Sequence, residues 1–138
     1  MEAEVAMVWG WATDTVDKPA ELSAMRRSLR SWLDRLDIHD DCDALLLVAN
    51  ELTTNAIEAS TAPTDPVALR VGIEGDQLVV AAANVGPSFV LPSTFPGDPT
   101  AASGRGLVIV QSLTDKMQVR RDGRYVVVSA RLWLGSAS

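Results

Sequence analysis

The chain has 138 residues, of which 47% are hydrophobic and 22% charged, and its formal net charge is −6. This length fits one domain with a core of its own, and the acidic balance argues against a protein that binds nucleic acid through its phosphates. Cys42 is the only cysteine and His39 the only histidine, which excludes an internal disulfide and a Cys/His zinc site. The longest strongly apolar run, residues 45–49, is too short to cross a bilayer. Because residues 1–4 are acidic where a signal peptide is basic, we expect a cytoplasmic protein.

The first half of the chain predicts one strand and two helices. Residues 5–13 are apolar and carry Trp9 and Trp11 two positions apart, which predicts a strand with both indoles on one face. Asp17 and Pro19 then predict the start of a helix that runs to about residue 36. A second helix is predicted over about 41–60. Its apolar stripe is formed by Leu45, Ala49, Leu52 and Ala56.

The second half predicts two hairpins separated by a long loop. Residues 67–73 alternate and 77–85 are apolar, and Gly75-Asp76 between them predicts a hairpin turn. Residues 86–103 hold four of the seven prolines and fit no helix or strand. A short helix is predicted up to about residue 113, followed by a closing hairpin. The order predicts one domain over 1–138: an α/β sandwich of the α+β class, with a mixed, mainly antiparallel sheet and about three helices on one face.

Basic residues are concentrated near the end of the chain. Six of the twelve lie between Arg105 and Arg131, where only Asp115 and Asp122 are acidic. Such a run forms either the solvated face of a hairpin or a docking surface for an acidic partner, and we favour the solvated face.

Glu51 and Asn55 are the first candidates for chemistry. They lie four residues apart on the second predicted helix, so both side chains project from one arc beside the apolar stripe. A carboxamide oxygen can ligate Mg²⁺, a hard cation that takes oxygen ligands, and a carboxylate can act as a general base. Exposed Glu and Asn residues four positions apart are common on helices without any function, so the pair alone does not define a site.

Two glycine-containing segments are the other candidates. Gly104, Arg105 and Gly106 precede the short predicted helix, where two glycines and free N–H groups can hold phosphate. Asn84 and Gly86 end an apolar strand, where an amide can read the edge of a base and a glycine lets the base lie against the backbone. A plain loop-to-helix junction and a turn asparagine are the alternatives. The chain has no P-loop motif, and Ile109 interrupts the dinucleotide fingerprint.

Taken together, these motifs and their order resemble those of the Bergerat-fold ATP-binding domains of histidine kinases and gyrase-type ATPases. The stretch 50–57 is most similar to the anti-sigma factor serine/threonine kinase branch of bacteria. The resemblance covers nearly the whole chain.

The resemblance implies a role for each motif. Glu51 matches the catalytic carboxylate and Asn55 the Mg²⁺ ligand. Asn84 occupies the position of an aspartate that accepts from the adenine amino group, with Gly86 two residues later. The phosphate-contacting segment is matched by Gly104, Arg105, Gly106 and Leu107, and residues 87–103 match the ATP lid.

Three positions depart from the family's pattern. Asn84 replaces the aspartate, Ser88 replaces a second glycine, and Ala59 replaces a histidine that many members carry. In addition, the lid contains no Lys or Arg.

The function that this resemblance implies is an ATP- and Mg²⁺-dependent protein serine/threonine kinase of the anti-sigma type. Its partners would be an anti-sigma factor antagonist and a sigma factor, and the resemblance also admits a homodimer. The alternative is a nucleotide-binding or protein-interaction module with weak or no phosphotransfer. A sensor histidine kinase fragment fits less well, because no dimerisation helix with a phosphorylatable histidine is evident in the sequence.

Overall fold

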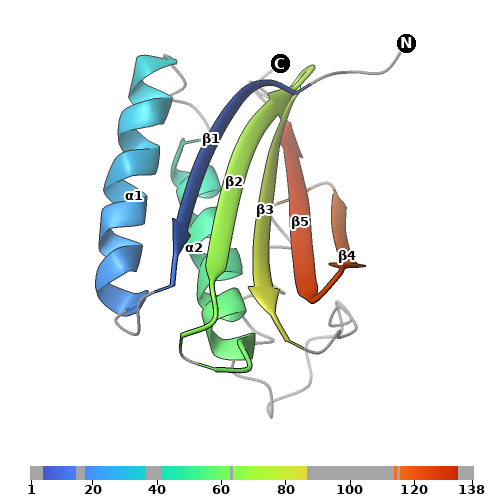
Figure 1. Cartoon of the computed structure of the whole chain (residues 1–138). Coiled ribbons are helices and arrows are strands. Elements are labelled where there is room, and N and C mark those ends of the chain that lie inside the picture. Colours follow the sequence, from blue (N-terminus) through green and yellow to red (C-terminus); the bar gives the residue numbers. More distant parts are fainter. Residues whose placement is uncertain are drawn as a thin grey trace, which may run out of the picture.

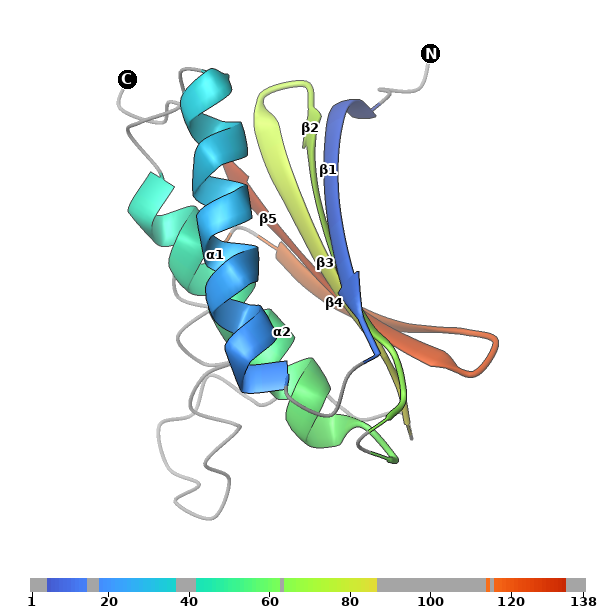
Figure 2. The same cartoon turned by 60° about the vertical axis from the view of Figure 1, so that its left-hand side comes forward.

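The computed structural model describes residues 5–14, 18–36, 42–62, 64–86, 114 and 116–133. They form a five-stranded antiparallel sheet with two helices packed on one face (Figures 1 and 2). The elements are β1 (Val5–Thr13), α1 (Lys18–Arg35), α2 (Cys42–Ala59), β2 (Val67–Glu74), β3 (Gln77–Val85), β4 (Lys116–Asp122) and β5 (Tyr125–Trp133). The predicted α+β sandwich is therefore confirmed, with two helices in the described part where about three were predicted. The third predicted helix, up to residue 113, lies outside the described residues.

The strand order is β1-β2-β3-β5-β4, so β1 and β4 lie at the two edges of the sheet. Hairpins join β2 to β3 and β4 to β5 through two-residue loops, since Glu74 pairs with Gln77 and Asp122 with Tyr125. Gly75 and Gly123 adopt φ of 61° and 63° in these loops. Tight hairpin loops need positive φ, which glycine adopts without steric cost, so both predicted turns are explained by their glycines.

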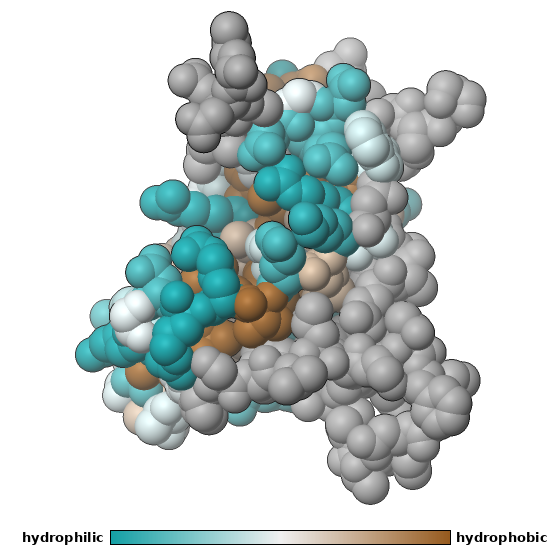
Figure 3. Space-filling model, turned by 90° about the vertical axis from the view of Figure 1, so that its right-hand side faces the viewer, coloured by the Kyte–Doolittle hydropathy of each residue, from teal (hydrophilic) through white to brown (hydrophobic). Residues whose placement is uncertain are grey.

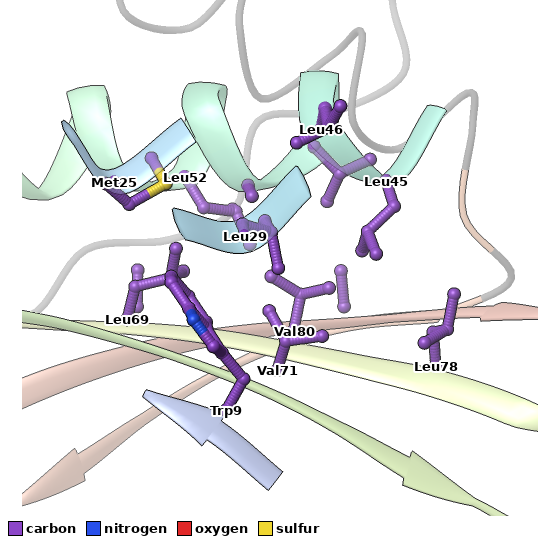
Figure 4. Close-up of a cluster of buried hydrophobic side chains, with 14 of the residues drawn as sticks. Trp9, Met25, Leu29, Leu45, Leu46, Leu52, Leu69, Val71, Leu78 and Val80 are labelled. Carbon is purple, nitrogen blue, oxygen red and sulfur yellow. The ribbon is translucent and has the colours of Figure 1, made fainter. Parts of the chain in front are cut away.

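The core lies between the sheet and the helices. The predicted stripe of α2 is buried, with Leu45 and Ala49 fully enclosed. On β3 the inward positions alternate with half-buried ones, as a strand with one covered face requires. Figure 4 shows Trp9, Leu52 and Val80 among the side chains that meet in this layer. Each such aliphatic side chain contributes roughly 1.5–3 kcal/mol when fully buried.

The two helices cover different parts of the sheet. Helix α2 packs on β3 and β2, while α1 packs on β1 and against α2. Trp9 supports the α1 contact, since its indole Nε1 donates to Ser28 Oγ at 3.1 Å. Neither helix of the described residues is long and apolar enough to span a bilayer. Helix α2 is thus the inner helix, and its C-terminal end lies beside the end of β3.

The opposite edge of the sheet is polar. On β4, Met117 and Val119 are half-buried, and the other five side chains are exposed. Figure 3 looks at this side of the molecule, where hydrophilic residues cover most of the described surface and smaller hydrophobic areas lie between them. This exposure is compatible with both interpretations of the basic run, a solvated face and a docking surface.

Candidate functional site

Glu51 and Asn55 lie on α2 at the boundary between core and surface. Both are half-buried, while Leu52 and Ala56, each one position further along, are 1% and 3% exposed. The helix therefore presents the carboxylate and the carboxamide from one arc, about 6 Å apart along its axis at 1.5 Å per residue. The burial of Leu52 and Ala56 fixes the rotation of α2 about its axis, because any other rotation would expose these core residues.

The C-terminal end of α2 is joined to the end of β3. The Thr61 amide donates to the Val85 carbonyl at 3.0 Å. Gly86 packs so closely that a Cβ there would lie 2.6 Å from the Ala59 carbonyl oxygen. Ala59 follows Asn55 by four residues and so continues the same face of the helix. These contacts place the Asn84–Gly86 strand end beside the last turn of α2, one helical turn beyond Asn55.

Asn84 lies on the inward face of β3 and is 2% exposed. Its side-chain nitrogen Nδ2 is buried and has no hydrogen-bond partner among the described residues. A Cβ on Gly86 would come within 3.0 Å of this nitrogen. An unpaired buried amide costs about 1–3 kcal/mol, so a protein retains one where something else supplies the partner.

A side chain from the far edge of the sheet also holds this strand end. Arg121 Nη2 on β4 donates to the Gly86 carbonyl at 2.8 Å. Sequence reasoning missed this contact, because Arg121 belongs to the basic run interpreted as a solvated face. No local pattern signals a bond between residues 35 positions apart.

The described residues do not form a metal site from protein ligands alone. No group of three or more His, Cys, Asp or Glu side chains comes together among them. Mg²⁺ bound with a nucleotide does not require such a group, because it keeps several waters and takes one or two protein oxygens together with substrate phosphates. The partial negative charge at the C-terminal end of a helix favours a cation nearby. No basic side chain of α2 lies in its last turn.

The remaining predicted residues lie outside the described part of the chain. They are Gly104, Arg105, Gly106 and Leu107 of the phosphate segment and residues 87–103 of the lid. Their roles remain predictions from the sequence.

Two of the motifs singled out in the sequence thus lie on α2 and at the adjoining end of β3. The model of the histidine kinase-like ATPase domain family matches residues 15–132. The chain belongs to this family.

Comparison with solved structures supports the fold. The histidine kinase AdeS of Acinetobacter baumannii superposes with a TM-score of 0.54 at 14% sequence identity, over 94% of this chain and 70% of that chain. No curated protein sequence matches the chain.

Family membership implies ATP as the ligand, usually with Mg²⁺, and the site can be tested against that ligand. The orphaned Asn84 nitrogen is a polar group suited to a base, and Gly86 keeps the neighbouring space free of a side chain. Asn55 offers an oxygen of the kind that Mg²⁺ takes. The residues present therefore fit the nucleotide.

Proposed function

We propose that this chain is an ATP·Mg²⁺-dependent protein serine/threonine kinase of the anti-sigma type, acting on a regulatory protein partner. The observation that carries the proposal is the half-buried pair of Glu51 and Asn55 on α2, tied through Ala59 to the Asn84–Gly86 strand end. In this proposal the metal-ligating, base-reading and proton-accepting groups come from one helix and one strand end.

Each residue has a distinct task in this proposal. Asn55 binds the metal through its amide oxygen, and Asn84 and Gly86 bind and orient the base. Glu51 accepts the proton that the attacking serine or threonine hydroxyl loses. Bound Mg²⁺ neutralises charge on the phosphates during transfer. Positioning and proton transfer are thus the contributions of the protein.

The partners in this proposal are a small antagonist protein, which is phosphorylated, and a sigma factor, which is sequestered. The resemblance of residues 50–57 to the anti-sigma kinase branch supports both. The Glu51 side chain is half-buried, and the proposal has a hydroxyl of the antagonist approach its exposed part.

A second function is favoured by one specific observation. Asn84 stands where the resemblance implies an aspartate, and its buried nitrogen has no partner. A module that binds nucleotide and contacts proteins without transferring phosphate would tolerate this change. Such a module would retain Asn55-dependent binding and would not need Glu51.

A phosphotransfer assay separates these functions. Purified chain is incubated with Mg²⁺, ATP labelled on the γ-phosphate and a candidate antagonist protein. A kinase labels the antagonist, Glu51→Gln abolishes the label, and Glu58→Gln does not, because Glu58 is exposed on the same helix. Nucleotide binding without label on any candidate antagonist supports the module, and label that survives Glu51→Gln contradicts the proposed base.

A further inference from the structure

The Asn84 amide is the one buried side-chain nitrogen or oxygen without a partner among the described residues. Other buried polar side chains there are satisfied: Thr53 Oγ1, for instance, donates to the Ala49 carbonyl at 2.7 Å within α2. Since the large majority of buried side-chain polar atoms in proteins are paired, the unpaired Asn84 nitrogen calls for an explanation.

Two of the neighbouring backbone carbonyls already accept a hydrogen bond. The Thr61 amide donates to the Val85 carbonyl at 3.0 Å, and the Gly86 carbonyl accepts from Arg121 at 2.8 Å. Gly86 has no side chain, and its Cβ position lies 3.0 Å from the Asn84 nitrogen. The nitrogen therefore lies at a close-packed junction between β3 and α2, and none of the described residues supplies its acceptor.

Adenine and the 6-oxopurines present different groups at C6. Adenine offers an amino group at C6, which is a donor, whereas guanine and hypoxanthine offer a carbonyl oxygen, which is an acceptor. A carboxamide carries both an acceptor oxygen and a donor nitrogen, and a half-turn about the Cβ–Cγ bond exchanges them. The nitrogen as it stands matches a 6-oxopurine, and the turned amide matches adenine.

We propose that Asn84 makes the base site tolerant, so that it admits 6-oxopurine nucleotides beside ATP. The inference rests on the proposed function, because it assumes that the nucleotide base lies against Asn84. A site rejects the wrong ligand strongly when that ligand leaves a buried polar group of the site unpaired. An amide that can turn pairs with either base, so neither base is rejected in this way.

Competition between ATP and inosine triphosphate tests the inference, because hypoxanthine has a carbonyl oxygen in place of the adenine amino group at C6 and differs otherwise only by the proton that N1 then carries. We expect the wild-type chain, with Mg²⁺, to bind both within about tenfold. Asn84→Asp, which keeps the shape but only accepts, should shift the ratio towards ATP by about tenfold or more. Gln77→Glu is the matched control, since it makes the same amide-to-carboxylate change at the other end of β3 and should leave the ratio unchanged.

A second readout needs no variant. The chain has three asparagines, so few side-chain amide signals appear in a ¹⁵N NMR spectrum. Inosine triphosphate should move the Asn84 amide signals, as expected when its nitrogen gains an acceptor. This keeps the inference testable if a buried carboxylate prevents Asn84→Asp from folding.

The results separate the inference from the proposed function. A wild-type preference for ATP beyond tenfold, or a ratio unchanged in a folded Asn84→Asp, overturns the tolerance and leaves nucleotide binding intact. Asn84 signals that do not move on saturation with inosine triphosphate overturn it too. If neither nucleotide binds, the proposed function and the inference both fail.

Discussion

Gly86→Ala should destabilise the protein through one contact. The new Cβ would lie 2.6 Å from the Ala59 carbonyl oxygen, and an ordinary contact begins at about 3.4 Å. The strand end and the end of α2 must therefore separate by about 0.8 Å. Backbone strain is not involved, because Gly86 is not among the described glycines with positive φ.

The surrounding hydrogen bonds oppose this separation. Val85 accepts from Thr61 at 3.0 Å, and Gly86 accepts from Arg121 at 2.8 Å. Overpacking in a tight site costs about 1–3 kcal/mol, and weakening one bond adds about 0.5–1.5 kcal/mol. Loss of chain entropy in the unfolded state offsets about 0.4–1 kcal/mol. We expect a net loss of about 1–3 kcal/mol, or roughly 3–10 °C in Tm for a chain of this size.

Urea and thermal unfolding measure this effect, and Gly10→Ala is the matched control. A Cβ at Gly10 would meet its nearest neighbour, the Leu69 carbonyl, at 3.9 Å, which is ordinary contact. Gly10→Ala should therefore change the free energy of unfolding by less than about 1 kcal/mol. If Gly86→Ala is as stable as the wild type, the junction between α2 and β3 is looser than its contacts indicate, and the reasoning fails.

Three further predictions concern the nucleotide. Asn55→Ala should weaken ATP binding in the presence of Mg²⁺ by about 1.5–3 kcal/mol, the scale of a hydrogen bond to a charged group. If calorimetry finds unchanged affinity and unchanged Mg²⁺ dependence, Asn55 is not the metal ligand. Glu51→Gln should keep ATP affinity but slow phosphotransfer by about 10²–10⁴-fold; transfer at the parent rate excludes Glu51 as the base. Residues 87–103, the predicted lid, should exchange amide hydrogens more slowly with ATP·Mg²⁺ than without it, and equal exchange contradicts a lid there.

The parts of the fold that follow a periodic pattern could be predicted from the sequence. The stripe through Leu45 and Leu52 matched the buried face of α2, and the alternation predicted for residues 67–73 matched the buried side chains Val67, Leu69 and Val71 of β2. Gly75 and Gly123 marked the hairpin turns because positive φ is a local demand. Glu51 and Asn55 share an arc for a similar reason, since four residues make about one helical turn.

The contacts that assemble the site could not be predicted in this way. The approach of Gly86 to Ala59 and the bond from Arg121 join distant positions. They depend on how α2 crosses the sheet and on β4 lying at the far edge, and neither is encoded by local spacing. The burial of Asn84 was only partly foreseen: its place at a strand end was evident, but its unpaired nitrogen depends on everything packed around it.

The central claim is that ATP·Mg²⁺ binds where Asn55 on α2 meets the Asn84–Gly86 strand end. A ¹⁵N NMR titration with ATP·Mg²⁺ that follows the side-chain amides of the three asparagines tests it most directly. Asn50 is the internal reference, because its oxygen accepts from Arg26 at 2.8 Å on the side of α2 that faces α1. The account predicts saturable shifts of the Asn55 and Asn84 signals with little change at Asn50. Saturable binding that leaves both Asn55 and Asn84 unmoved, or no binding at all, would contradict it.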